Sequence, residues 1–230
     1  MMKSVLKALA VAVVLSPAVG FAQGPKAATY ITDEEVKAVN ATPGVDRTIK
    51  VVDIGPENFA VGVIHRGATG GAARGAAPAG GAGGGAGRGA AAGGGAAGGG
   101  AAAAAAQPCG EQSTAPATGS VPGGIAHDQQ TEGYLIISGA GTLVTGGKIV
   151  NGRKSPSDSP VTKELNGPSC SGTIAGADVV KKNVKTGDII IIPAGVPHGW
   201  SEIPDHVDYL SFRPSARVLE AGYTHPAIKK

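Results

Sequence analysis

Few side chains of this sequence can perform chemistry, and the histidines are the most informative of them. Five are present, at positions 65, 127, 198, 206 and 225. His198 follows an apolar strand candidate and a turn that contains Pro193, Gly195 and Pro197. Prolines restrict φ, and a glycine can adopt backbone angles that other residues avoid. The turn therefore fixes the direction in which the chain leaves it, and with it the direction of the His198 imidazole.

The residues around His198 resemble the second signature motif of the cupin superfamily. The spacing of that motif is matched by Gly187, Pro193, Gly195 and His198, which are separated in turn by five, one and two residues. Glu202 stands where the family usually has an asparagine.

The first cupin motif is matched in its second half. The family pattern is matched by His127, Glu132 and Gly139, which are separated in turn by four and six residues. The position of the motif's first histidine is occupied by Ile125, which cannot bind a metal. The resemblance covers about residues 47–213 and places a Gly/Ala-rich insertion before the first motif.

The resemblance implies an all-β fold, a cupin-like antiparallel β-barrel of the jelly-roll (double-stranded β-helix) type. It also implies a divalent metal held inside the barrel by His127, Glu132 and His198. Two imidazoles and a carboxylate suit iron(II), manganese, zinc or nickel. Three protein ligands would leave open positions for water or a small-molecule substrate.

A fourth ligand has three candidates. Gln129 or Gln130 could supply an amide oxygen. His65 is the third, because it ends the alternating apolar face of the strand candidate Asn58 to His65. If that face points into the barrel, His65 points there too; a structural role in hydrogen bonding is the alternative.

These features favour an exported metalloenzyme that oxidises or isomerises a small organic molecule. One alternative is a barrel that binds a small molecule without metal or turnover, and another is an envelope protein that interacts through its Gly/Ala insertion. Tyr134 and Trp200 are expected to line the pocket or to pack in the core. No basic stripe with interleaved aromatics is present, so we expect no nucleic-acid partner. Strand edges need covering, which favours a homodimer.

The N-terminus predicts export to the periplasm or the medium. Lys3 and Lys7 flank the start of an apolar run, Ala8 to Leu15, and small residues end at Ala22. This pattern is typical of a signal peptide over residues 1–22, and the run is shorter than the roughly 20 residues of a membrane span. Cleavage would remove two lysines and lower the formal net charge from +3 to +1. No later segment is long and apolar enough to span a membrane.

The two cysteines, Cys109 and Cys170, are expected to pair in such an oxidising compartment. Two free buried thiols are the alternative.

The rest of the chain divides by composition. Residues 23–46 form an N-terminal segment with a short helix to about Asn40, because Thr32 and Glu35 match a capping box. Residues 47–215 are expected to form the barrel, interrupted by a flexible, disordered Gly/Ala-rich insertion over 68–106. Residues 216–230 form a C-terminal tail.

Short strands are expected throughout the barrel. Glycines 139 and 141 predict a hairpin between Tyr134 to Ser138 and Thr142 to Thr145, and residues 151–172 are expected to be a long polar loop. The other strand candidates are Thr48 to Asp53, Asn58 to His65, Lys148 to Val150, Thr173 to Ala175, Val179 to Val184, Asp188 to Ile192, His198 to Glu202 and Val207 to Arg213.

Overall fold

The computed structural model describes residues 27–69, 107–115, 119–160 and 162–228. The signal peptide predicted over residues 1–22 lies outside these ranges, as does all of the Gly/Ala insertion beyond residue 69. The elements are α1 (Asp33–Asn40), β1 (Asp46–Asp53), β2 (Asn58–Gly67), β3 (Pro108–Cys109), β4 (Val121–His127), β5 (Glu132–Thr145), β6 (Lys148–Lys154), the short π-helix η1 (Thr162–Asn166), β7 (Ser169–Ala175), β8 (Val180–Lys185), β9 (Ile189–Ile192), β10 (His198–Glu202) and β11 (His206–Ser215).

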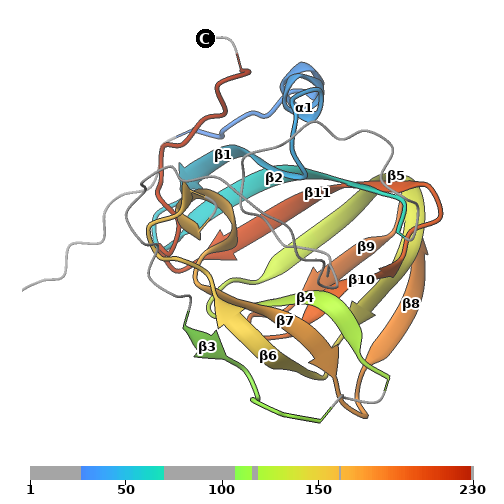
Figure 1. The fold of residues 1–230 in the computed structure, drawn as a ribbon. Helices are drawn as coiled ribbons and strands as arrows, with labels where there is room; N and C mark the ends of the chain where they lie inside the picture. The colour runs from blue at the N-terminus through green and yellow to red at the C-terminus, as the bar shows by residue number, and fades with distance from the viewer. Residues whose placement is uncertain (1–26, 70–106, 116–118, 161, 229–230) are drawn as a thin grey trace, which may run out of the picture.

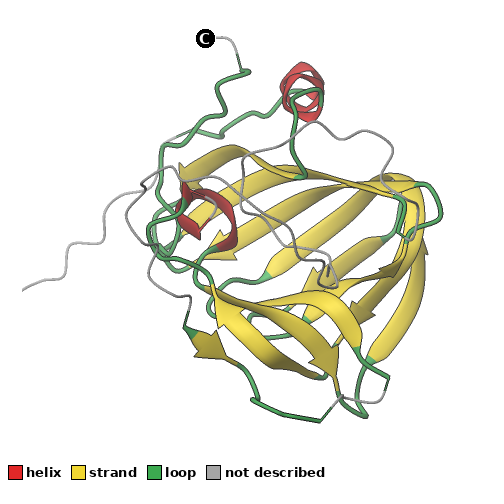
Figure 2. Ribbon diagram, in the orientation of Figure 1, coloured by secondary structure: helices red, strands yellow, loops and turns green. Residues whose placement is uncertain are grey.

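The strands form two curved antiparallel sheets that face each other (Figures 1 and 2). The first sheet has the order β1-β2-β11-β5-β9. The second has the order β8-β5-β10-β4-β7-β6-β3. The long strand β5 belongs to both sheets. Two antiparallel sheets that face each other and share a strand confirm the predicted all-β jelly-roll architecture.

Strand β5 corrects the predicted hairpin, because residues 132–145 form one strand. Gly139 marks a bend in it, with a φ of 73°. The half before the bend pairs with β11 and β9, and the half after it pairs with β8 and β10. A Cβ at Gly139 would lie 2.0 Å from the carbonyl oxygen of His206. The glycine therefore lets one strand pass from sheet to sheet while a neighbouring strand lies against it.

The predicted loop over residues 151–172 is partly wrong. Strand β6 continues to Lys154 and β7 begins at Ser169, so only the middle of the segment lies outside the sheet. Strand β4 was not expected, because Pro122, Gly123 and Gly124 are poor strand formers. Its pairing with β7 and β10 supplies the backbone hydrogen bonds that its sequence does not favour by itself.

Helix α1 begins as predicted, with a capping box between Thr32 and Glu35. It lies across the outer face of the first sheet (Figure 2). Val39 from the helix packs there with Ile49, Val61 and Val63, which are all buried. The apolar alternation of β2 is therefore explained by the helix outside the barrel.

The interior between the sheets contains its own core. Its members are Ile64, Tyr134, Ile136, Leu143, Val184, Ile192, Ile203, Val207 and Tyr209. A disulfide joins Cys109 of β3 to Cys170 of β7, with Cα atoms 6.0 Å apart, which confirms the predicted pairing. Within the described ranges, no helix has the length and apolar character needed to cross a membrane.

Candidate metal centre

Three side chains converge inside the barrel from the starts and ends of three strands. His127 is the last residue of β4, Glu132 the first of β5 and His198 the first of β10. Their exposed fractions are 3%, 0% and 4%. One ligand atom from each lies within 4.8 Å of the other two. The structure thus brings together the three residues that the motifs single out.

The tautomer of His127 follows from its partner on β7. The Oγ of Ser169 lies 3.0 Å from the carbonyl oxygen of Asn166 and 2.9 Å from that of Gly167, so its proton is directed to these acceptors. The same oxygen is 2.8 Å from His127 Nδ1 and must accept from it. The Nδ1–H tautomer leaves the Nε2 lone pair directed toward Glu132. Burial lowers the pKa of His127, opposed by the charge of Glu132, and favours the neutral ring.

The tautomer of His198 is fixed in the same way. Its Nδ1 is 3.0 Å from the carbonyl oxygen of Val196, which can only accept a hydrogen bond. Gly195, with a φ of 80°, donates its N–H to the carbonyl oxygen of His127 at 2.7 Å. The turn predicted to aim His198 is therefore attached to the other histidine. Hydrogen bonds from Nδ1 to outer partners are typical of metal-binding histidines.

The carboxylate of Glu132 lies between the two rings. Its Oε1 is 3.4 Å from His127 Nε2, and its Oε2 is 3.0 Å from His198 Nε2. Oε2 also accepts a hydrogen bond from the Tyr134 hydroxyl at 2.5 Å. Oε1 is 2.5 Å from Arg213 Nη2, in an ion pair that lacks the alignment of a hydrogen bond.

These contacts determine the charge of Glu132. Burial alone would raise the pKa of its carboxyl, but the neighbouring Arg213 guanidinium holds that pKa well below its usual range. Burial, and next the charge of Glu132, raise the pKa of the Tyr134 hydroxyl well above its usual value. The site therefore combines an ionised carboxylate with a phenol that keeps its proton.

The donor set fits a divalent transition metal. Two ligand atoms that are each about 2.1 Å from one ion lie roughly 3.0 to 3.4 Å apart at tetrahedral or octahedral angles. The two Nε2-to-carboxylate distances have these values, each measured to a different oxygen of Glu132. Glu132 Oε1 is buried and lies against Arg213 without a hydrogen bond, so it keeps a lone pair for a second cation. Two imidazoles and one carboxylate suit iron(II), manganese, zinc or nickel.

The candidate fourth ligands lie elsewhere. His65 is on the outer face of the first sheet, beside the residues that α1 covers, and its Nδ1 is 2.6 Å from Asp208 Oδ1. Its strand face therefore does not point into the barrel, and His65 has the hydrogen-bonding role that was the alternative. Gln129 is exposed. Gln130 is buried and donates from Nε2 to the carbonyl oxygen of Leu165, which leaves its Oε1 without a hydrogen-bond partner among the described residues.

Tyr134 and Trp200, the two aromatic residues expected to line the pocket or to pack in the core, have different neighbours. Tyr134 touches Glu132 through its hydroxyl, and its ring lies edge-on to His198 with centroids 6.3 Å apart. The Trp200 ring packs against Tyr209, with centroids 5.8 Å apart. Tyr209 in turn packs against Tyr134 at 4.4 Å. Trp200 therefore supports the aromatic layer behind the site.

Ser169 and Arg213 are the functional residues that the sequence did not reveal. Ser169 lies directly opposite His127 in the pairing of β4 with β7, and Arg213 is near the end of β11. Neither belongs to a motif. One signal could have indicated Arg213: it is a charged residue at an inward-facing position of an alternating strand.

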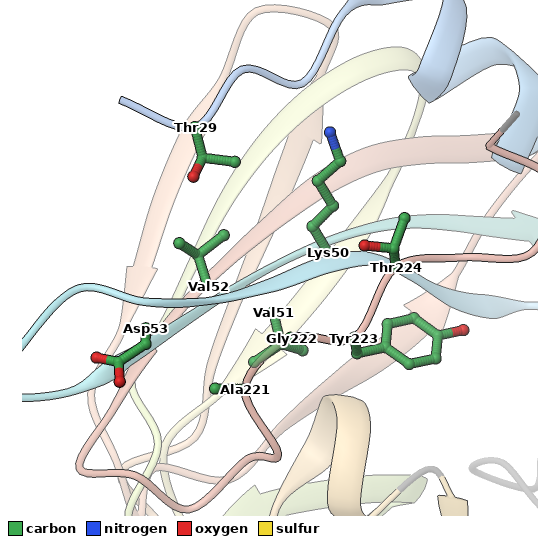
Figure 3. Close-up of a pocket in the computed structure, with 9 residues that line it drawn as sticks. All are labelled: Thr29, Lys50, Val51, Val52, Asp53, Ala221, Gly222, Tyr223 and Thr224. Atoms are coloured by element: carbon green, nitrogen blue, oxygen red, sulfur yellow. The ribbon is translucent and has the colours of Figure 1, made fainter. Parts of the chain in front are cut away.

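Two surface cavities, of about 560 and 500 Å³, lie away from these residues. Figure 3 shows the larger one, between β1 and the C-terminal segment; its lining residues are Thr29, Lys50, Val51, Val52, Asp53, Ala221, Gly222, Tyr223 and Thr224. Its charged groups are engaged, because Lys50 pairs with Glu35 and Asp53 with Arg217. Neither cavity is lined by a residue of the candidate metal centre.

Comparisons with known proteins give limited matches. No protein-family model matches the sequence, and no curated protein matches it. Among solved structures, Peruvianin-I, described as a cysteine peptidase from Thevetia peruviana latex, superposes with a TM-score of 0.32 at 11% identity, over 88% of this chain and 86% of the other. An oxalate oxidase superposes with a TM-score of 0.31 at 12% identity, over 77% of this chain and 55% of the other. This chain thus spans about half the length of the oxalate oxidase.

Proposed function

We propose that the chain is an exported cupin-like metalloprotein that holds one divalent metal ion with His127, Glu132 and His198 and acts on a small organic molecule. The observation that supports it best is the tautomer of both histidines. Each Nδ1 is directed to an acceptor outside the site, so each Nε2 lone pair faces the ionised carboxylate. Two imidazole lone pairs and a carboxylate that face one another in a buried site form an arrangement that a shared cation would stabilise.

The chain's own residues would prepare the site for chemistry. Ser169 and the carbonyl of Val196 hold the two rings, and Arg213 holds one oxygen of Glu132. The Tyr134 hydroxyl holds a proton at Glu132 Oε2, next to the space between the rings. A bound divalent ion would act as a Lewis acid on a substrate oxygen. The reaction we propose is an oxidation or an isomerisation, because the motifs resemble those of cupin enzymes.

Export is part of the proposal. The disulfide between Cys109 and Cys170 supports it, since disulfides persist in oxidising compartments. The signal-peptide pattern before Ala22 supports it independently. N-terminal sequencing of protein collected outside the cytoplasm tests it: a mature chain that begins near Gln23 is expected, and a full-length intracellular chain would contradict it.

The metal is tested by elemental analysis of the purified mature protein. About one equivalent is expected, either as isolated or after addition of iron(II), manganese, zinc or nickel. His127→Ala and His198→Ala should each lose it, whereas His225→Ala should keep it, because His225 accepts a hydrogen bond from Ala227 outside the cluster. Metal well below one equivalent, with no gain on addition, refutes the proposal.

A barrel that binds a small molecule without metal is the second candidate. The ion pair between Glu132 and Arg213 favours it, because it compensates the buried carboxylate within the protein. This candidate predicts that His198→Ala leaves ligand binding intact and that no metal is found.

A further inference from the structure

Arg213 occupies an unusual place beside the candidate metal centre. It is 3% exposed. Its Nη1 donates to the carbonyl oxygen of Leu165 and to Asn166 Oδ1, and its Nε donates to Ser211 Oγ. Its Nη2 forms the ion pair with Glu132. The guanidinium thus donates three hydrogen bonds to the protein, and its Nη2 faces Glu132.

As a consequence, the charges of the site's own side chains cancel when no metal is bound. Glu132 contributes one negative charge and Arg213 one positive charge, and the two are in contact. Imidazoles that bind a metal are neutral. Within the described residues, the cluster contains one carboxylate. The half-buried pair of Arg66 with Asp46 is balanced by itself.

A divalent ion in this place would therefore add two positive charges that no protein group offsets. The three ligand residues are at most 4% exposed, so bulk water screens the charge only weakly. Burying an uncompensated charge is costly, and the cost falls when an opposite charge enters with it.

We propose that this site takes a small anion with carboxylate oxygens as its ligand, in preference to a neutral molecule of the same shape. The inference rests on the proposed metal site and names the class of substrate for it. Arg213 acts as a positioning residue, because it sets the charge of the site through its ion pair with Glu132.

The test uses the full mature chain loaded with manganese(II), with the metal content measured first. Malonate is the anionic probe, and malonamide is its uncharged counterpart of similar size. Isothermal titration calorimetry should show malonate binding at least about tenfold more tightly than malonamide, since one unit of charge within about 5 Å, at an effective dielectric of about 20, is worth more than that factor. Protein without manganese should bind malonate at least about tenfold more weakly.

Variants of Arg213 separate charge from structure. Arg213→Lys keeps the charge, so its malonate affinity should stay within about threefold of the wild type. Arg213→Met removes the positive charge that cancels Glu132, so its malonate affinity should fall about tenfold or more. Arg217→Met is the control, because Arg217 is exposed and pairs with Asp53. If Arg213→Met does not fold, the comparison of malonate with malonamide in the wild type decides.

The outcomes distinguish the two proposals. A chain that does not take up manganese, or any of the other three metals, contradicts the metal centre itself. A chain that takes up about one equivalent of manganese but binds malonamide as tightly as malonate, or binds neither, overturns the anion inference alone. Loss of malonate binding in Arg213→Met with retention in Arg213→Lys supports it.

Discussion

Replacing Ser169 with alanine tests how the fold positions the His127 ring. Ser169 is fully buried, and its Oγ is the acceptor for His127 Nδ1 at 2.8 Å. The alanine removes that acceptor and leaves a buried N–H without a partner, which costs about 1 to 3 kcal/mol of unfolding free energy. It also frees the ring to rotate or to change tautomer. Loss of such an outer partner typically lowers metal affinity about 10 to 100-fold.

Two measurements separate these effects. Urea denaturation of the protein without added metal gives the change in unfolding free energy, and a metal titration gives the change in affinity. Ser201→Ala is the control, because Ser201 is exposed and its Oγ makes only a 3.5 Å contact with the Thr142 carbonyl. A Ser169→Ala protein that is destabilised but binds metal within twofold of the wild type would show that Ser169 does not set the tautomer.

Three further predictions concern stability. Reduction of the Cys109–Cys170 disulfide should lower the unfolding free energy by about 4 kcal/mol, because it closes a loop of 61 residues; a change under about 1 kcal/mol in urea denaturation would contradict this. The pKa of Glu132 lies well below its usual value of 4.5 despite burial, so its contribution to stability is present above about pH 4.5 and is lost as the pH falls toward the folded pKa. Glu132→Gln should therefore reduce the change in unfolding free energy between about pH 5 and pH 3, and an unchanged profile would refute the assignment. Gly139→Ala should destabilise the protein by about 2 kcal/mol more than Gly195→Ala, because both have positive φ but only the Gly139 Cβ would meet backbone; equal losses would contradict this.

The sequence predicted the site better than the strands around it. The spacing of the two motifs singled out His127, Glu132 and His198, which the structure brings together. That prediction did not depend on where the strands were expected to begin and end. The hairpin at Gly139 was wrong for a physical reason. A glycine with positive φ serves a turn and a bend in a long strand equally well, and only the partner strands decide between them.

The residues that the sequence could not place depend on distant partners. Arg213 contacts Glu132, which is 81 positions earlier, and Ser169 contacts His127 across the pairing of β4 with β7. For His65, the sequence left two positions open. Its alternation correctly indicated a buried strand face, but alternation does not say whether the barrel interior or a helix such as α1 covers that face.

The most direct test is anomalous diffraction from crystals of the mature protein that contain the bound metal, recorded at the absorption edge of that metal. We predict one strong anomalous peak, about 2.0 to 2.3 Å from the Nε2 atoms of His127 and His198 and from a carboxylate oxygen of Glu132. A fully loaded crystal with no peak at this position, or with its peak beside other residues such as His65 and Asp208, would contradict the account.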